Sequence, residues 1–444
     1  MARTVTPSDD PPVTPDKAPE PAGSADRRAR RLLMEMFEAA VASANPAKML
    51  ASHLPPLPKG RCIVVGAGKA AASMAAAVEA AWPHVDLTGA VAVPYGYGMA
   101  CRCIRVIEAG HPVPDSNSVA AAQAILNCVE GLRADDLVLA LVSGGGSAAM
   151  CLPAAGLTLE DKQITNRLLL ASGFDIRTMN AVRRRISAIK GGRLAAAAAP
   201  ARVVTLAISD IPGDGPSAIA SGPTALPRQV EPDLREVARK LGPGLPPRVA
   251  ELLARPPEPV REGRASPITV VAAPAGALKA AADVAKAHGV TPLVLGDDIE
   301  GESSLFAREM AASLSGPLKP TVWISGGETT VTIGNGGGGR GGRNTEFVLA
   351  LARELNGRAD IWALAADTDG QDGANLGAAG AFAGPDTIRR AEAMGMDPAE
   401  YLAKHDSGSF FQALGDLVTT GPTRTNVNDF RAILSCPGDY RAVD

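Results

Sequence analysis

The sequence predicts an α/β protein made of two α/β lobes, the first of them built on a Rossmann-like parallel sheet. Three observations support this prediction: short apolar runs alternate with longer helical patterns, glycine-rich turns follow several of these runs, and proline-rich stretches divide the series in two. A chain of 444 residues, 46% of them hydrophobic, is long enough for two cores of ordinary size. Because aromatic residues make up only 3%, Ala, Val, Leu and Ile must fill these cores.

The first lobe is expected over residues 28–262, after a disordered extension over residues 1–27 that is rich in Pro, Asp, Ser and Thr. The helical pattern starts near Arg28. Buried strands are then predicted over residues 62–65, 89–93, 137–142 and 202–209. Helices are predicted over residues 69–82, 118–131, 159–171 and 178–189. This alternation is the βαβ rhythm of a mostly parallel sheet.

The second lobe is expected over residues 263–444, and proline-rich segments around 212–227 and 243–267 indicate the connection. Its βα series is predicted to open with a strand over Ile268–Val271. The series continues with a helix over 275–288 and with strands over 292–295, 321–324 and 361–365. We expect the active site in the cleft between the two lobes.

The composition favours a small-molecule partner. A formal net charge of −3 and a pI near 6.0 give no electrostatic reason to bind nucleic acid or an anionic membrane. No signal-peptide pattern and no run of about 18 apolar residues occurs, so a cytoplasmic location is expected. The six cysteines form no CxxC pair and the five histidines show no metal-binding spacing. Reduced thiols are therefore expected, and any metal would be a hard cation held by oxygen ligands.

The segment ISGGETTVTIGNGGGGRGGRNTE, residues 324–346, has the features of an anion site. Glu328 precedes a glycine run, and Arg340 and Arg343 stand just before a helical pattern. Glycine allows backbone N–H groups to approach an anion closely, and a helix N-terminus adds partial positive potential. The alternative is a flexible surface loop with solvated arginines.

The turn in VVGAGKAAASM is the first of four further glycine or acidic turns at strand ends, where open α/β sheets bind ligands. Gly66 and Gly68 make a tight turn, and Lys69 stands at the helix start, within reach of a phosphate or carboxylate. Ala71 fits half of a dinucleotide fingerprint, but Asp86 precedes the next strand instead of following it, and the Walker pattern is absent. A structural turn with a solvated lysine is the alternative.

The turn in LVSGGGSAAM, residues 143–147, again suits an anion. Ser147 as a hydrolase nucleophile is disfavoured, because Ala149 stands where GxSxG needs its second glycine. No histidine is poised to activate this serine. The lone His111, in GHPVPDSNS, favours a loop-anchoring hydrogen bond over catalysis.

Two acidic turns complete the set. Asp210 and Asp214, in AISDIPGDGPSAIASGPT, would hold a Mg²⁺ that bridges phosphates or accept a hydroxyl proton. Asp367, Asp369 and Asp372, in AADTDGQDGANLGAAG, lie at another strand end but do not fit the spacing of an EF-hand. For each acid the alternative role is capping of its own turn.

Eight segments in a fixed order form a family pattern: VVGAGKAA, GHPVPDSNS, LVSGGGSA, AISDIPGDGPSAIASGPT, SGGETTVTI, GGRNTEFVLALA, AADTDGQDG and TTGPTRTNVND. Together they resemble the glycerate 2-kinase family, whose C-terminal part is called the MOFRL domain, here about residues 318–435. The resemblance runs from about residue 28 to about residue 434. It implies two α/β domains with the site in their cleft. It also implies transfer of the γ-phosphoryl group of ATP, with Mg²⁺, to the 2-hydroxyl of D-glycerate.

The resemblance also implies residue roles. The family's catalytic lysine matches Lys69, and its C-lobe arginine matches Arg343. We expect these cations to stabilise the transferring phosphoryl group, and Asp210 or Asp214 to bind Mg²⁺ or take the hydroxyl proton. Nucleotide-binding residues are expected at Gly66, Gly68, Ser143, Gly144, Gly145, Gly146, Ser147, Glu328, Gly341, Gly342, Asn344, Asp367, Thr425 and Asn426. The expected ligands are D-glycerate and ATP; a homodimer is an open expectation.

Two other functions are weighed against the kinase. Relatives of this family are sometimes labelled hydroxypyruvate reductases, and that reaction uses nearly the same three-carbon skeleton. The missing ribose-binding acid and the absence of a histidine–acid pair to protonate a carbonyl favour ATP over NAD(P). A non-catalytic ligand-binding protein would bind without turnover, and nothing in the sequence requires it.

Overall fold

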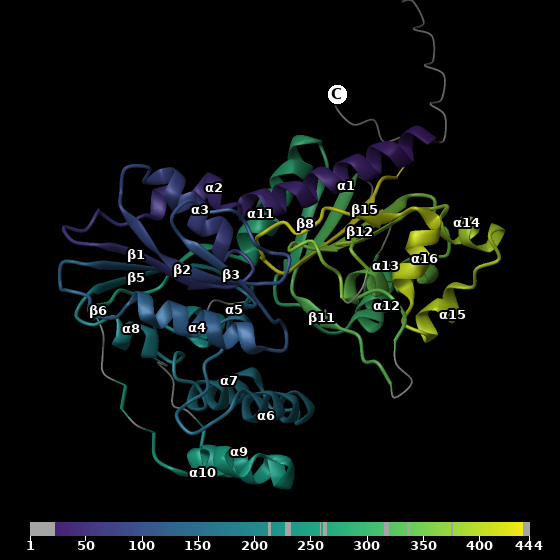
Figure 1. Cartoon of the computed structure of the whole chain (residues 1–444). Coiled ribbons are helices and arrows are strands. Elements are labelled where there is room, and N and C mark those ends of the chain that lie inside the picture. The colour runs from purple at the N-terminus through teal and green to yellow at the C-terminus, as the bar shows by residue number, and fades with distance from the viewer. Residues whose placement is uncertain are drawn as a thin grey trace, which may run out of the picture.

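The computed structural model describes residues 23–211, 215–226, 232–257, 259–260, 264–314, 319–334, 338–373 and 376–437. Within these residues two sheets lie side by side, and helices cover their faces (Figure 1). The predicted two-lobed α/β architecture is therefore confirmed. No helix in the described part of the chain is long and apolar enough to cross a membrane.

The first sheet has seven strands, and every pairing in it is parallel. Its order is β3-β2-β1-β4-β5-β6, with β7 pairing β5 as well. The strands are β1 (Cys62–Ala67), β2 (Leu87–Pro94), β3 (Arg105–Ala109), β4 (Leu137–Val142), β5 (Arg202–Ile208), β6 (Arg264–Ala265) and β7 (Thr269–Ala272). All residues of β1 and β4 are buried, as continuous apolar runs predict for strands covered on both faces. The strand order reverses between β1 and β4, which makes their carboxyl ends the switch point where such sheets bind ligands.

The second sheet has six strands in the order β14-β13-β12-β15-β10-β8, and only β10 and β8 pair in parallel. Its strands are β8 (Thr291–Gly296), β10 (Thr321–Ser325), β12 (Ile361–Asp367), β13 (Gly380–Ala383), β14 (Leu417–Val418) and β15 (Asp429–Ser435). A separate two-stranded ribbon pairs β9 (Glu300–Glu302) with β11 (Glu328–Thr330). The buried strand β15 lies between β12 and β10, so the last described strand of the chain holds the middle of this sheet.

One hydrophobic core continues across the junction of the two sheets. Helices α1 (Gly23–Ser43), α3 (Ala71–Ala81) and α11 (Pro274–Ala287) cover the upper face of both sheets in Figure 1. Their buried side chains form a single cluster that includes Val64 of the first sheet and Leu434 of the second. The shared core fixes the two lobes relative to each other, and hence the site between them.

The opposite faces have separate coverings. Under the first sheet lie α4 (Ser116–Cys128), α5 (Gly146–Ala149) and α8 (Arg193–Ala197); under the second lie α12 (Ser303–Ser313), α13 (Arg343–Leu355), α14 (Thr387–Ala393), α15 (Pro398–Ala403) and α16 (Ser407–Leu414). The remaining short helices are α2 (Pro46–Met49) and the 3₁₀ turns Leu50–His53, Pro216–Ser221 and Gly242–Gly244. These helices complete the sandwich around each sheet.

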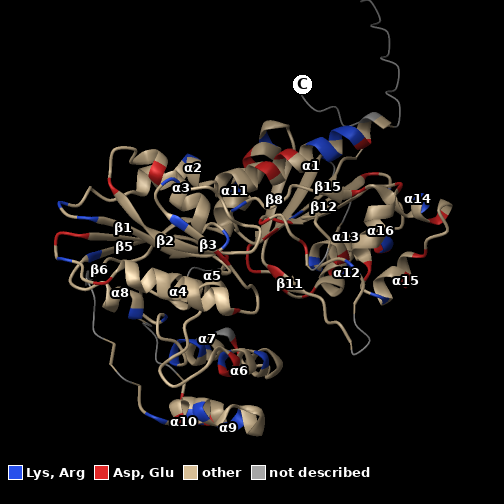
Figure 2. Cartoon of the chain, viewed as in Figure 1, with Lys and Arg blue, Asp and Glu red and all other residues tan. Residues whose placement is uncertain are grey.

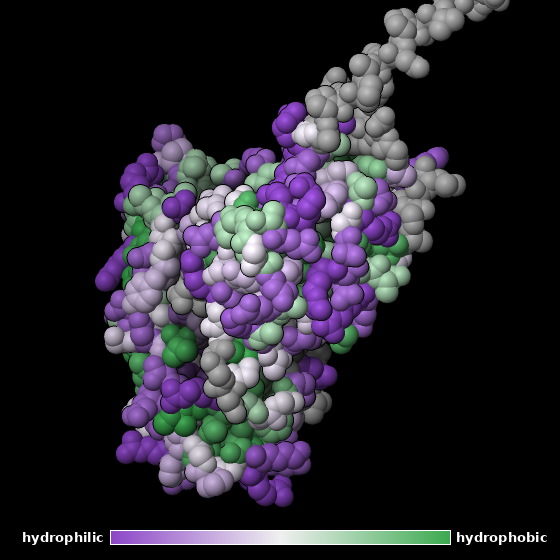
Figure 3. Space-filling view, turned by 90° about the vertical axis from the view of Figure 1, so that its right-hand side faces the viewer, coloured by the Kyte–Doolittle hydropathy of each residue, from purple (hydrophilic) through white to green (hydrophobic). Residues whose placement is uncertain are grey.

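A further helical layer lies below the first lobe in Figure 1. It contains α6 (Leu159–Ala171), α7 (Ile176–Arg185), α9 (Leu234–Leu241) and α10 (Pro247–Ala254), and it has its own small core of Leu169, Val182 and Val249. Figure 3 shows hydrophobic surface gathered at the height of these helices, whereas polar residues cover much of the molecule above. The layer lies beneath the switch point and lines one side of a cavity described below.

The structure differs from the sequence-based expectations in two places, and it adds the strand directions of the second sheet. Helix α1 begins at Gly23, five residues before the expected start at Arg28, and it packs on α11, β12 and β15 of the second sheet. The strand expected to open the second lobe, Ile268–Val271, instead pairs with β5 and completes the first sheet as β7. The second sheet is mixed because the C-terminal strand β15 inserts antiparallel at its centre. An apolar run predicts that a strand forms, but not which neighbour it pairs with.

Candidate active site

The turns after β1 and β4 lock together at the switch point. Gly66 lies within β1, where a Cβ would overlap the backbone of Leu141, and Gly68 has a φ of +127° and lies against Ser143. The Lys69 amide donates to the carbonyl of Gly144 at 2.8 Å, and the Ala70 amide donates to Ser143 Oγ at 3.0 Å. These glycines are required because the two turns approach more closely than side chains allow. Their contacts set the position of Lys69.

Lys69 meets a carboxylate from the other lobe. Its Nζ forms an ion pair with Asp369, in the loop after β12, and its side chain is only 15% exposed. Burial alone would lower the pKa of Lys69, but Asp369 and Asp367 together raise it well above its ordinary value. The lysine is therefore charged at neutral pH and joins the two lobes.

Asp210 lies directly beyond β5, beside the second glycine turn. A Cβ on Gly144 would overlap its Oδ2, and Asn426 Nδ2 donates to this oxygen at 3.1 Å. Asn428 Nδ2 donates to the Asp210 carbonyl at 3.2 Å. Burial raises the pKa of Asp210 to about 6, although nearby Lys69 lowers it. The other predicted metal ligand, Asp214, lies outside the described residues.

Arg343, the first residue of α13, is held by three carboxylates. Its Nε donates to Asp429 at 2.8 Å, its Nη2 to Asp367 at 2.8 Å, and its Nη1 pairs with Glu328 at 3.2 Å. The pKa of Arg343 is raised because these carboxylates outweigh burial. Burial and then Asp369 raise the pKa of Asp367. The arginine side chain is 23% exposed, so it is not closed off completely from solvent.

The N-terminus of α13 is capped by a carboxylate of the protein, that of Asp372. Asp372 accepts from the amides of Asn344 at 2.9 Å and Thr345 at 2.8 Å. A Cβ on Gly342 would overlap this side chain, and Gly341 has a φ of +138°. We expected the partial positive charge of this helix end to stabilise a bound anion, but the Asp372 carboxylate occupies that position instead. A role of Gly341, Gly342 and Asn344 in nucleotide binding stays a prediction.

A fully buried ion pair, Arg431 with Asp429, holds Arg343 in place. Arg431, on β15, donates to Asp429 at 2.6 Å, to Thr329 Oγ1 at 2.9 Å and to the Gly326 carbonyl at 2.9 Å. Its side chain is 1% exposed and that of Asp429 is 0% exposed. Asn344 Nδ2 also donates to Asp429, at 2.8 Å. This network holds the arginine fork in one orientation.

Some of the other predicted residues lie at this junction, and the rest lie around it. Thr425 Oγ1 donates to the Ala44 carbonyl at 2.9 Å, so it ties the end of α1 to the second lobe. His111 makes no hydrogen bond through its ring in the described part of the chain, contrary to the anchoring role expected. Burial and then Lys69 lower the pKa of His111 to about 4, so the ring is neutral. Ser147 Oγ accepts from Lys190 Nζ at 2.7 Å.

The structure thus brings Lys69, Asp210 and Arg343 to one junction and adds counter-ions that the sequence analysis did not assign as site residues. Asp369 and Asp372 lay in a turn already singled out, and Asp429 lay in the motif TTGPTRTNVND. Arg431, at the second position after Asp429 on a strand, had no motif to mark it. Their pairing depends on which strands become neighbours.

The junction carries an excess of negative charge. Six carboxylates face three cations there, which leaves three formal negative charges; the carboxylates are Asp210, Asp367, Asp369, Asp372, Asp429 and Glu328, and the cations Lys69, Arg343 and Arg431. Figure 2 shows acidic residues coloured along the inner ends of the strands between the two sheets. No group of three or more His, Cys, Asp or Glu is arranged to hold a metal in the described residues. Mg²⁺, which binds through one or two carboxylates and substrate phosphates, fits this donor set.

The fold and the site define a two-lobed α/β enzyme with a charged small-molecule site at the lobe junction. Two family profiles match the chain: a domain of unknown function, DUF4147, over residues 32–254, and the MOFRL family over residues 321–429. The chain belongs to the glycerate 2-kinase family, as its motifs predicted.

Three similar proteins illustrate this membership. A protein of Agrobacterium vitis, provisionally named hydroxypyruvate reductase, is 51% identical over 417 residues, which cover 92% of this chain and 95% of the relative. A glycerate 2-kinase of Pyrococcus horikoshii is 37% identical, over 83% of this chain and 86% of its own. The crystal structure of a glycerate kinase of Thermotoga maritima matches with a TM-score of 0.80 at 33% identity, covering 92% of this chain and 100% of that one.

Proposed function

We propose that this protein is a glycerate 2-kinase that transfers the γ-phosphoryl group of ATP to the 2-hydroxyl of D-glycerate. The observation that carries the proposal is the meeting of Lys69, from the first lobe, with the Arg343 network of the second lobe at the switch point. Phosphoryl transfer needs charge stabilisation and positioning more than covalent help from the protein. The glycerate kinases among the relatives support the same chemistry.

Each residue has a distinct part in the proposed reaction. The 2-hydroxyl oxygen forms a bond to the γ-phosphorus as the bond to the bridging oxygen of ADP breaks, and the hydroxyl proton passes to the Asp210 carboxylate. Its pKa of about 6 suits a base that works near neutral pH. Lys69 and Arg343 stabilise the charge on the transferring group. Mg²⁺, when bound, neutralises phosphate charge; with Asp210 acting as the base, Asp214 is the predicted carboxylate that would hold it.

The hydroxypyruvate reductase name of some relatives is the competing assignment. A nicotinamide cofactor on a sheet of this order needs an acid at the end of β2 to bind its ribose. Here β2 ends at Pro94, and Tyr95 follows. A histidine that protonates a carbonyl needs a carboxylate hydrogen-bonded to its ring, and the neutral His111 has none in the described residues. These features favour ATP over NAD(P)H.

The test is a pair of parallel assays. Purified protein is incubated with D-glycerate, ATP and Mg²⁺, and the product is identified by ³¹P NMR; a second sample receives NAD(P)H and hydroxypyruvate. We expect 2-phosphoglycerate in the first sample and no NAD(P)H oxidation in the second. Oxidation without phosphorylation would make this a reductase, and ligand binding without either reaction would make it a binding protein. A cytoplasmic location and a homodimer remain expectations.

A further inference from the structure

A second charged region lies on the far side of the glycine turn from Lys69. A cavity of about 260 Å³ opens between this turn and the helical layer, and its lining includes His111, Gly145, Ser147, Lys162, Arg183 and Lys190. A Cβ placed on Gly145 would lie 3.4 Å from Lys69 Cγ and 3.3 Å from His111 Nε2. Gly145 and His111 therefore form a thin wall between the cavity and the lysine of the junction.

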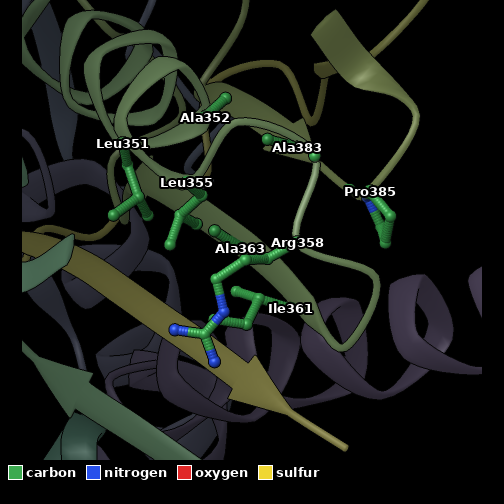
Figure 4. Close-up of a pocket in the computed structure, with 10 residues that line it drawn as sticks. Leu351, Ala352, Leu355, Arg358, Ile361, Ala363, Ala383 and Pro385 are labelled. Carbon is green, nitrogen blue, oxygen red and sulfur yellow. The ribbon is translucent and has the colours of Figure 1, made fainter. Parts of the chain in front are cut away.

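A second, smaller pocket lies in the second lobe, and it is not a candidate ligand site. This cavity of about 10 Å³ lies between α13 and the strands β12 and β13, and Figure 4 shows Leu351, Leu355, Ile361 and Ala363 around it. It is a packing gap in the second core, too small for a ligand.

Three cations line the large cavity, and among the described residues each hydrogen-bonds only to neutral groups. Lys190 Nζ donates to the Ser147 carbonyl at 2.5 Å and to Ser147 Oγ at 2.7 Å. Lys162 Nζ donates to the Ile186 carbonyl at 3.0 Å. Arg183 donates to Asn166 Oδ1 from Nε at 3.1 Å and from Nη2 at 2.9 Å. The two lysines are buried, with 3% and 6% of Lys190 and Lys162 exposed.

No carboxylate of the described residues forms an ion pair with any of these three cations. Burial lowers the pKa of Lys190 to about 7, and neighbouring Lys162 lowers it further. Burial likewise lowers the pKa of Lys162 and of Arg183. Buried charges are costly unless they are paired, so two buried lysines beside a partly buried arginine favour a negative partner. No carboxylate of the described residues supplies that partner.

We propose that this cavity is an oxyanion subsite, in which Lys162, Arg183 and Lys190 bind a carboxylate or phosphate group of a ligand whose reacting part extends past Gly145 to Lys69. Arginine presents a planar fork that matches either group, and the two lysines add point charge. The inference rests on the proposed function only for the choice of ligands: both the acceptor acid and the nucleotide carry such groups. The cavity volume and its three cations suit an anionic group with its hydration water.

The test measures binding without turnover, so it is independent of catalysis. Wild-type protein and Arg183→Gln are titrated calorimetrically with D-glycerate, which probes for a carboxylate, and separately with inorganic tripolyphosphate, which probes for nucleotide phosphates. We expect Arg183→Gln to weaken at least one probe tenfold or more, and the weakened probe identifies the group that binds. Arg177→Gln, an exposed arginine on the same helix, is the matched control and should bind both probes like the wild type.

Two further variants separate charge from packing. Arg183→Lys keeps a cation and should retain the binding that Arg183→Gln loses, to within a few fold. Lys162→Met, on the neighbouring helix α6, should weaken the same probe tenfold or more, and it serves if Arg183→Gln does not fold. If folded variants of both positions bind both probes as tightly as the wild type, the cations only hold the helical layer and the proposal is overturned. A lack of kinase activity with intact, Arg183-dependent binding would instead reject the proposed function alone.

Discussion

The acidic junction and the basic cavity are neighbours that handle buried charge in opposite ways. At the junction, Lys69 pairs with Asp369, and Arg343 pairs with Asp367 and Asp429, so each cation has carboxylates from distant parts of the chain. In the cavity, the described part of the chain offers Lys190 and Arg183 only carbonyl, hydroxyl and amide oxygens. The cations of the junction are thus paired with carboxylates, whereas no described carboxylate balances the cations of the cavity. The same substitution type should therefore have opposite effects in the two regions.

The largest expected effect is at the lysine that joins the lobes. Lys69→Ala should lower kcat about 10³-fold or more, because charge stabilisation on a transferring phosphoryl group is worth that much. The rate of ATP-dependent glycerate phosphorylation measures it, with circular dichroism to confirm folding. Lys48→Ala, an exposed lysine on α2, is the control. Near-normal turnover by a folded Lys69→Ala protein would remove Lys69 from the mechanism.

The second effect concerns stability at the junction. Arg431→Leu deprives buried Asp429 of one of its cations and should lower the free energy of unfolding by about 3–5 kcal/mol. Urea unfolding followed by fluorescence or circular dichroism gives the value. Arg389→Leu removes an arginine that is 76% exposed and should change the stability by less than about 0.5 kcal/mol. Equal effects of the two substitutions would contradict the structural role of the buried pair.

A third change tests the close approach of the second glycine turn to Asp210. In Gly144→Ala the new methyl group overlaps Asp210 Oδ2 and displaces this carboxylate, so kcat/KM should fall about 10–100-fold. Gly276→Ala is matched to it, because this helical glycine is exposed and no atom lies within 4 Å of the place that a Cβ would take. The control should keep full activity and gain about 0.5–1 kcal/mol of stability. A Gly144→Ala enzyme with wild-type kcat/KM would show that the reaction does not depend on the position of the Asp210 carboxylate.

The two regions should also give opposite limbs of the pH profile. Asp210, with a pKa of about 6, accepts a proton only when ionised, so kcat/KM should rise with pH and reach half of this limb near pH 6. Lys190, with a pKa of about 7, binds an anion when charged, so kcat/KM should decline as pH rises above 7. Initial rates from pH 5 to 9 test both limbs. Lys190→Met should lose the falling limb and keep the rising one; an unchanged falling limb would assign it to another group.

The smallest expected effect has the opposite sign to that of Arg431→Leu. Lys190→Met removes a buried cation that has no carboxylate partner among the described residues and should raise the stability of the ligand-free protein at pH 6 by about 1 kcal/mol. The folded-state pKa of Lys190 lies below its unfolded value, so the cost of its burial is complete below pH 7 and disappears as pH rises toward 10. The gain should shrink over that range. Thermal unfolding of both proteins at several pH values checks this, and a destabilised Lys190→Met at pH 6 would contradict the unbalanced charge.

Local patterns were sufficient for much of the fold and for the central residues of the site. The apolar runs around Val64 and Leu139 became buried strands of one parallel sheet, and the glycine turns after them met at the switch point. Long-range pairing was beyond a single sequence. Nothing local tells that β7 returns to the first sheet, that Asp369 reaches Lys69, or that β15 enters the second sheet at its centre.

The basic cavity was missed for a different reason. Lys162 and Arg183 lie on helices of mixed polarity, where charged residues ordinarily face water, and Lys190 lies in a short segment before a glycine pair. Only the packing of the helical layer beneath the glycine turn buries them together. Amphipathic spacing cannot distinguish a charged face that meets solvent from one that closes over a cavity.

Helix α1 has a consequence for the biosynthesis of the chain. Its apolar face, which includes Leu33, Met36 and Phe37, is buried, and it packs mainly on α11 and the second sheet. Translation makes this helix before its packing partners: α11 follows at residues 274–287, and β15 only at residues 429–435. The part of the apolar stripe that packs on β15 therefore stays uncovered after α11 and the whole first sheet have been made. Helix α1 reaches its complete packing only when the last described strand has been synthesised.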